Sequence, residues 1–225
     1  MWDYRPCRAA IRSPSVVGVR CVPWWGLISS AAAPLVLAGG WIVAARLQPR
    51  SYDPLADTVS ALAALGAADR WVMTLAFVAV AACEFATGLA LSPAGLPGRL
   101  ILMAGAVAGV VVAASPEQVG GSPRHAIWAA VGLCALTVWP AGAWRRGRAV
   151  PWALRPVATA WAVAVLLALL AWFVMELITG AGLAGLAERV LGLAQAGWPC
   201  AVAASCRRSE PATGTPRTAG TLVPG

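Results

Sequence analysis

Long apolar runs recur along this chain, each of about the length that a helix needs to cross a lipid bilayer. The hydrocarbon core is about 30 Å thick and a helix rises about 1.5 Å per residue, so one crossing takes about 20 apolar residues. Hydrophobic residues make up 60% of the 225 residues and charged residues 12%, which is about half the charged share of a soluble domain. The pattern predicts an all-α, polytopic integral membrane protein.

Six transmembrane helices are expected, with approximate bounds 24–45, 71–91, 100–115, 126–143, 155–175 and 189–205. The sixth segment is the least apolar, so the argument that it spans the membrane depends on the distribution of charged residues. Arginine and lysine collect on the cytoplasmic side of membrane proteins. Six spans with both termini cytoplasmic place 12 of the 17 basic residues inside, all arginine: Arg5, Arg8, Arg12, Arg20, Arg99, Arg145, Arg146, Arg148, Arg155, Arg207, Arg208 and Arg217. Five spans would leave Arg207 and Arg208 outside.

The two ends of the chain differ from the membrane domain, which we expect over residues 23–206. Residues 1–22 and 207–225 predict disordered tails, the first of them basic. Every basic residue is an arginine, and the chain is also rich in alanine, glycine and proline. This composition is typical of a high-GC bacterial genome, so we expect the protein to lie in a bacterial plasma membrane. The net charge of +8 lies in loops and tails and indicates no nucleic-acid partner.

The six cysteines form no C-x-x-C pair, and three of them lie inside apolar runs. This predicts neither a disulfide framework nor a metal site. No cofactor is expected.

The polar segment 46–70 separates the first two apolar runs. Asp53 can cap a short helix there, and Gly66 can end it in the left-handed conformation. Three apolar side chains would share one face of that helix: Leu55, Val59 and Leu62. We therefore expect an amphipathic helix in the first outer loop that lies on the lipid surface or covers the bundle.

Seven polar residues are expected to meet in a pocket at the outer face: Asp53, Asp57, Ser60, His125, Glu176, Glu188 and Arg189. Such a pocket could hold the polar end of an amphiphile. His125 is the one histidine of the chain and cannot build a typical zinc site alone. It could instead act with Asp57 and Ser60 as a hydrolytic set, although no nucleophile motif surrounds that serine.

Three further polar residues lie within the apolar runs: Glu84, Thr87 and Gln195. A charged side chain at the centre of a bilayer costs on the order of 3 kcal/mol or more. Two interpretations of Glu84 follow. It can be a proton-binding or ligand-binding acid that faces the bundle interior, or a protonated side chain that hydrogen-bonds Gln195 or Thr137 on a neighbouring helix.

Four segments of the chain resemble a bacterial membrane family known as domain of unknown function 998. They are 52–63 (YDPLADTVSALA), 69–73 (DRWVM), 185–189 (GLAER) and 194–199 (AQAGWP). The Asp57 and Ser60 step and a histidine that opens the fourth span, His125, match the pattern of that family, whereas many relatives carry histidine at the position of Glu84. The resemblance implies a six-span membrane protein, over about residues 23–206, with no established activity.

Three functional hypotheses result. The leading one is a non-enzymatic helical bundle that binds a membrane lipid or small amphiphile at its outer face. The first alternative is a proton-coupled transporter that uses Glu84. The second alternative is a membrane-embedded lipid hydrolase that uses Asp57, Ser60 and His125.

Overall fold

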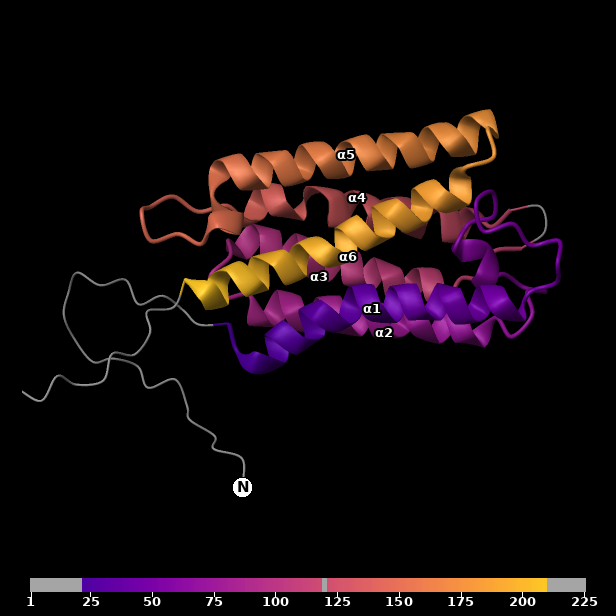
Figure 1. Ribbon diagram of the computed structural model, residues 1–225, viewed down its shortest axis with the longest axis horizontal. Helices are drawn as coiled ribbons and strands as arrows, with labels where there is room; N and C mark the ends of the chain where they lie inside the picture. The colour runs from indigo at the N-terminus through magenta and orange to yellow at the C-terminus, as the bar shows by residue number, and fades with distance from the viewer. Residues whose placement is uncertain (1–21, 119–120, 210–225) are drawn as a thin grey trace, which may run out of the picture.

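The computed structural model describes residues 22–118 and 121–209. Its six long helices are α1 (Trp24–Leu47), α2 (Trp71–Ala90), α3 (Leu96–Ala113), α4 (Pro123–Ala143), α5 (Pro156–Thr179) and α6 (Ala184–Arg208); two short 3₁₀ helices, η1 (Ser60–Ala63) and η2 (Trp152–Leu154), lie in the connections. The described residues contain no strand, so the all-α prediction is confirmed for this part of the chain. The long helices run side by side in one bundle (Figure 1). The predicted tails fall almost entirely outside the described residues.

Five of the six long helices, α1 to α5, are long and apolar enough to cross a membrane. Large apolar side chains on them point away from the bundle, such as Leu35 at 72% exposure and Ile178 at 73%. Such a surface suits hydrocarbon and not water. The chain is therefore a multi-pass membrane protein. Helix α6 is less apolar, but it packs against α1 and α5 and extends along the bundle from one end to the other (Figure 1).

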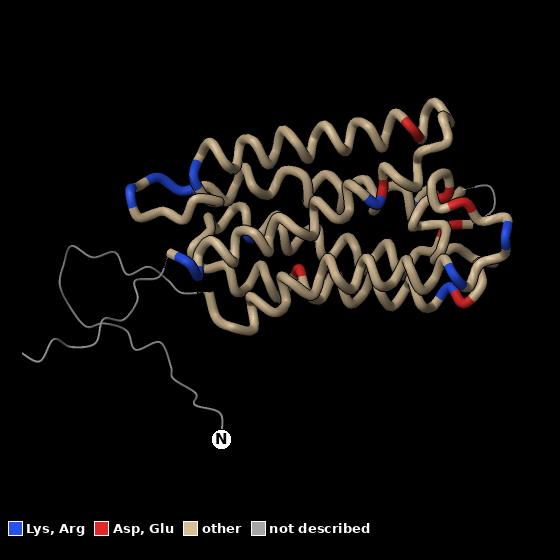
Figure 2. Tube along the Cα trace, in the orientation of Figure 1, with Lys and Arg blue, Asp and Glu red and all other residues tan. Residues whose placement is uncertain are grey.

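Charged residues lie at the two ends of the bundle, and the middle is almost free of them (Figure 2). One end, here called the arginine end, holds the start of α1, the α2–α3 and α4–α5 connections and the end of α6. The other end, here called the mixed-charge end, holds the other three connections and carries both signs of charge. One acidic residue lies within α2 and is buried there, Glu84. Two charged ends with an apolar middle are the arrangement that a bilayer demands.

Sequence signals account for several helix boundaries. The side chain of Ser122 accepts a hydrogen bond from the backbone N–H of His125 and so caps α4. Helix α5 ends at Gly180, whose φ of +63° is the left-handed conformation that glycine adopts readily. Helix α3 begins at Leu96 and not at the expected residue 100, because Pro97 fits a first helical turn, where its missing N–H has no partner to lose.

The predicted amphipathic helix in the first outer loop is not an α-helix in the structure. Residues 48–70 form turns and the four-residue η1. The side chain of Asp53 accepts from the N–H of Leu55, and the side chain of Asp57 accepts from the N–H of Asp53, at 2.9 and 2.8 Å. These local bonds stabilise turns in competition with a helix.

Part of the predicted packing of this loop is nevertheless present. Val59 and Leu62 are buried and pack in a cluster with α1 and α2 residues such as Met73. Leu55, in contrast, is 50% exposed. Gly66 has the expected positive φ, +100°, but it lies in a turn and does not end a helix. The loop is therefore docked on the bundle through its second half.

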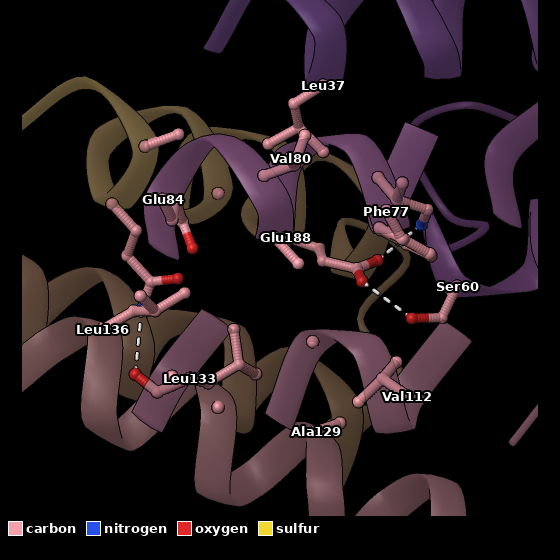
Figure 3. A pocket seen from close by; sticks show the side chains of 18 of the residues that line it. Leu37, Ser60, Phe77, Val80, Glu84, Val112, Ala129, Leu133, Leu136 and Glu188 are labelled. Carbon is pink, nitrogen blue, oxygen red and sulfur yellow. Dashed lines mark hydrogen bonds between the residues drawn. The ribbon is translucent and has the colours of Figure 1, made fainter. Parts of the chain in front are cut away.

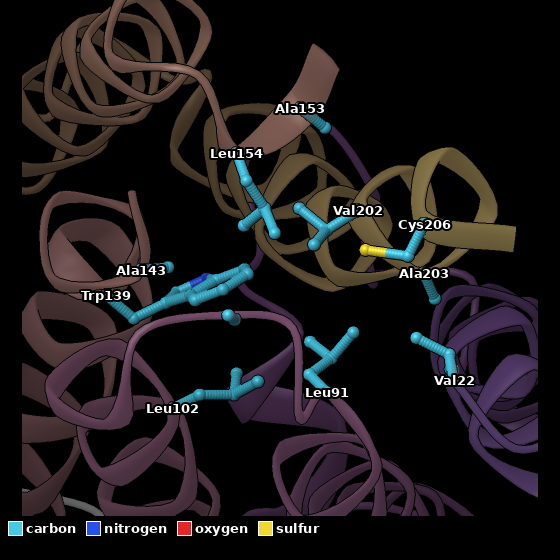
Figure 4. Packing of buried hydrophobic residues seen from close by; sticks show 11 residues of the cluster. Val22, Leu91, Leu102, Trp139, Ala143, Ala153, Leu154, Val202, Ala203 and Cys206 are labelled. Carbon is cyan, nitrogen blue, oxygen red and sulfur yellow. The ribbon is translucent and has the colours of Figure 1, made fainter. Parts of the chain in front are cut away.

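The arginine end of the bundle is closed by a cluster of buried apolar residues from α3, α4, η2 and α6, together with Val22 before α1 and Leu91 and Ala94 after α2 (Figure 4). Trp139 is fully buried there, between Leu154 and Leu102. Glycines allow the helices to approach closely beside it, since a Cβ on Gly98 would collide with the backbone of Ala143. The α3–α4 contact at this end is therefore closely packed.

Candidate ligand-binding cavity

A cavity of about 140 Å³ lies inside the bundle, under the first outer loop. Every long helix except α5 contributes to its wall, in most cases at one-turn spacings along a single face. The lining residues are Leu37, Trp41, Val59, Ser60, Phe77, Val80, Ala81, Glu84, Gly105, Gly109, Val112, Ala129, Gly132, Leu133, Leu136, Glu188, Gly192, Gln195 and Ala196. Most are apolar, and Glu84 and Glu188 are the ionisable ones. Their carboxyl groups lie at separate places along the cavity (Figure 3).

The outer end of the cavity is formed by Glu188 of α6 and by the loop. One carboxylate oxygen of Glu188 accepts from the backbone N–H of Val59 at 2.5 Å, and the other accepts from the hydroxyl of Ser60 at 3.1 Å. Both bonds are visible in the close view (Figure 3). Glu188 therefore holds the start of η1 against α6 and lines the cavity at the same time.

The deep end of the cavity is formed by Glu84 of α2 and Gln195 of α6. The side-chain nitrogen of Gln195 donates to the carbonyl of Leu133 at 2.9 Å and to the hydroxyl of Thr137 at 3.0 Å, both on α4. Within the described chain, no hydrogen bond or ion pair joins the carboxyl of Glu84 to another residue. The hydrogen bond expected from Glu84 to Gln195 or Thr137 is absent among the described residues, where the side-chain nitrogen of Gln195 donates to Thr137 instead.

Arg189, the residue after Glu188, points into the loop and does not line the cavity. Its guanidinium donates to the carbonyls of Pro54, Asp57 and Gly185, and to the hydroxyl of Tyr52. The planar fork of arginine suits several acceptors at once. Arg189 thereby fixes the first half of the loop on the start of α6, as Glu188 fixes the second half.

Burial raises the pKa of the Tyr52 hydroxyl above its ordinary value of 10.0, although the charge of Arg189 acts in the opposite direction. A raised pKa extends to higher pH the range in which the phenol stays neutral. A neutral hydroxyl can accept from Arg189 and still donate.

Two of the seven residues expected in an outer pocket line the cavity, namely Ser60 and Glu188. Asp53 and Asp57 bond the backbone of their own loop. Glu176 accepts from the indole N–H of Trp172 and from the backbone N–H of Leu183, and so stabilises the turn between α5 and α6. These three acids have structural partners of their own.

His125 is buried at the start of α4, where its Nδ1 lies 2.9 Å from the carbonyl oxygen of Ser115. Ser60 bonds Glu188, and no hydrogen bond joins it to His125 within the described chain. The proposed hydrolytic set is therefore not assembled. The described residues also contain no group of three or more His, Cys, Asp or Glu side chains able to hold a metal ion.

Of the three polar residues expected within the membrane, Glu84 and Gln195 line the cavity and Thr87 does not. The hydroxyl of Thr87 bonds the backbone carbonyl of Cys83 at 2.7 Å and the hydroxyl of Ser29 on α1 at 2.9 Å. It links α1 to α2. From the sequence, the polar residues of the outer face and those within the membrane were expected to form two separate groups. The structure instead brings Ser60 and Glu188 of the outer group into one cavity with Glu84 and Gln195 of the intramembrane group.

The cavity also depends on glycines that sequence reasoning did not assign to it: Gly105, Gly109, Gly132 and Gly192. Gly105 makes a close α3–α4 contact, because a Cβ there would collide with the side chain of Leu136. Gly109 instead leaves room, because a Cβ there would meet only Ala81, at 3.6 Å. The signal was present as glycine at one-turn spacing, but close packing and an open cavity give the same pattern.

A second hollow, of about 320 Å³, lies on the other side of α6, between α6 and α5. Its wall includes Trp152, Trp161 and Trp198, and two of these rings meet edge to face at 6.1 Å. No ionisable side chain lines it. Its polar groups are the indole N–H groups of its tryptophans, and it offers no charged side chain to orient a ligand.

Comparison with known proteins agrees with the resemblance noted from the sequence. No curated protein and no solved structure matches the chain. The family described as "Protein of unknown function (DUF998)" matches over residues 30–205, a range that contains the cavity and all four of the resembling segments. The chain belongs to the DUF998 family.

Proposed function

We propose that this protein binds a small amphiphile in the cavity under its outer loop. The observation that carries the proposal is the composition of the wall, which is apolar for most of its length and has a carboxyl group at each of two places, Glu188 and Glu84. Ligand sites have this character: an apolar surface with a few oriented polar groups. The volume of about 140 Å³ is close to that of an engineered protein cavity of about 150 Å³ that takes up benzene. It suits a small amphiphile and not a whole lipid.

We also propose that α6 is a sixth span, that the arginine end and both termini are cytoplasmic, and that the membrane is a bacterial plasma membrane. The support is the distribution of charge, since positive residues are retained on the cytoplasmic side. In this orientation the cavity lies beneath the outer face.

Filling the cavity tests the binding proposal. Gly109 lines it and has room for a side chain, so Gly109→Leu places four carbons in the open space. The control is Gly39→Leu, on α1, where an added Cβ meets nothing within 4 Å. Mass spectrometry of small molecules released from detergent-purified protein should find a bound species in the wild type and in the control but not in Gly109→Leu.

The same measurement can overturn the proposal. It fails if the wild type releases no bound species, or if Gly109→Leu retains that species. Thermal unfolding shows that the filled variant is folded, because filling a cavity without strain holds or raises the melting temperature.

Proton-coupled transport is a second candidate, favoured by the carboxyl of Glu84, which lines the cavity without a partner in the described chain. An acid in that position could exchange a proton with water or ligand. Glu84→Gln should then abolish pH-driven flux in proteoliposomes and leave the melting temperature unchanged. Flux that persists in this variant would exclude the mechanism.

A further inference from the structure

The deep end of the cavity offers hydrogen-bond acceptors and no free donor. Gln195 is 2% exposed, and its side-chain nitrogen already donates to Leu133 and Thr137. The carbonyl of Leu133 can only accept, so the amide nitrogen must face α4. The amide oxygen, Oε1, therefore points away from α4 and remains available as an acceptor.

Glu84 supplies the other acceptors. Its side chain is 3% exposed and lines the same cavity. Ionised, a carboxylate has about four lone-pair positions and accepts only. Most buried polar groups in proteins have a partner, and a buried acid without one is costly. Because no described residue supplies the partner, a ligand is the natural source.

No basic side chain of the cavity wall can neutralise these acceptors. The lining contains two glutamates and neither Arg, Lys nor His. The neighbouring cation, Arg189, donates to three loop and helix carbonyls and to Tyr52. The wall therefore holds two acids and no base, so a cationic ligand would favour the ionised form of these acids and not be repelled.

We propose, building on the proposed binding function, that the deep end of the cavity binds the primary ammonium group of a small alkylamine. Three N–H donors of one ammonium can meet the carboxyl of Glu84 and Oε1 of Gln195. The alkyl chain lies against apolar wall residues such as Val80 and Leu136. The end near Glu84 has no aromatic cage of the kind that quaternary ammonium groups require, since the ring of Trp41 lies under Arg189 and Phe77 lies toward Ser60 (Figure 3).

The experiment measures binding of n-butylamine, n-butanol and tetramethylammonium to the purified full chain by calorimetry. Glu84→Gln removes the charge and keeps the shape. Glu117→Gln is the matched control, because Glu117 lies in the α3–α4 loop outside the cavity. Butylamine should bind the wild type and the control alike, and its Kd should rise about tenfold or more in Glu84→Gln, because charge-assisted hydrogen bonds are lost. Butanol should bind more weakly, with little change on this substitution.

Three results would overturn the assignment: no butylamine binding to the wild type, an unchanged Kd in Glu84→Gln, or equally tight binding of butanol or tetramethylammonium. Failure here is distinguishable from failure of the proposed function. A bound species that Gly109→Leu removes, together with no preference for butylamine, leaves the cavity as a ligand site and excludes the amine. A bound species that Gly109→Leu retains excludes the cavity itself.

Discussion

Arg189 is the residue that does most to hold the outer loop in place. Its guanidinium reaches acceptors at Tyr52, Pro54 and Asp57, all more than 130 positions earlier in the chain. Lysine could not serve all of them from one point charge. Arg189 acts on the charge of the neighbouring Glu188, but its guanidinium bonds the loop and no basic side chain lines the cavity.

The burial of Tyr52 beside Arg189 leads to a prediction about how the stability of the protein depends on pH. Because its pKa is raised, the neutral hydroxyl is the form that the folded protein favours. The stability that it contributes is complete below the unfolded pKa of 10.0 and is lost as pH rises through the higher folded value. The chain has two tyrosines, so ultraviolet titration in a Tyr4→Phe background follows Tyr52 alone and should give a midpoint above 10.0.

Unfolding the same variant should return the midpoint to about the ordinary value. A midpoint at or below the ordinary value in the folded protein would mean that the charge of Arg189 outweighs the burial of the phenol. The melting temperature of Tyr52→Phe should show a weaker decline above about pH 10 than that of the wild type.

At the scale of residues, the sequence identified polar side chains in unusual places but not their partners. Glu84, Glu188, Ser60 and Gln195 were all singled out, and all line the cavity. Asp53 was singled out for the same reasons and bonds its own loop. Whether such a residue lines the cavity or bonds its own loop depends on contacts between residues more than 100 positions apart. Composition and local spacing carry no information about such contacts.

The first outer loop and the start of α6 form one structural unit. Backbone N–H groups of Gly185 and Leu186 donate to the carbonyls of Ala56 and Leu55 at 3.2 and 3.0 Å. The loop backbone thus satisfies donors that the first turn of α6 leaves open. Gly185 permits this approach, because a Cβ there would collide with the carbonyl of Asp57.

Substitution of that glycine tests the unit. Gly185→Ala should lower the free energy of unfolding in detergent by about 1–3 kcal/mol, the usual cost of overpacking, and should increase hydrogen exchange at residues 49–64. Gly197→Ala is the control on the same helix, since an added Cβ there meets nothing within 4 Å. It should leave stability unchanged or raise it slightly, because alanine favours helix more than glycine does. Equal melting temperatures for the two variants would contradict the close contact.

At the scale of elements, apolar runs predicted the positions of the long helices well, because a span of fixed length is demanded by the bilayer. The loop helix failed because side-chain bonds of Asp53 and Asp57 favour turns locally. Periodicity over a few residues could not weigh those bonds against a helix. The family resemblance is confirmed over residues 30–205.

The whole molecule is asymmetric in charge. The α4–α5 connection and the end of α6 carry arginine and no acid among the described residues, whereas the opposite end carries both signs (Figure 2). An electrical asymmetry of this kind orients a membrane protein during insertion.

Reporter fusions test that orientation. Alkaline phosphatase, which folds only outside the cytoplasm, should be active when joined after Gly66 and inactive when joined after Arg208. Activity after Arg208 would mean that the number of spans is odd, or that the whole orientation is reversed. Inactivity after Gly66 would mean that the loop 46–70, and the cavity beneath it, face the cytoplasm. The phosphatase fusion after Arg208 is expected to give no signal, so a green fluorescent protein fusion at the same position is the control. It should be fluorescent if that position is cytoplasmic.

The bonds between the outer loop and α6 also set an order of events during synthesis. Pro54 and Arg189 are 135 residues apart, so at a translation rate of about 5–20 residues per second, between about 7 and about 27 s separate the appearance of the loop from that of its anchor. Throughout that interval Arg189 cannot supply the donors that these loop carbonyls accept from in the folded protein. Helix α6 thus fixes a loop that is synthesised much earlier, and a chain that stops before α6 has an unanchored first loop.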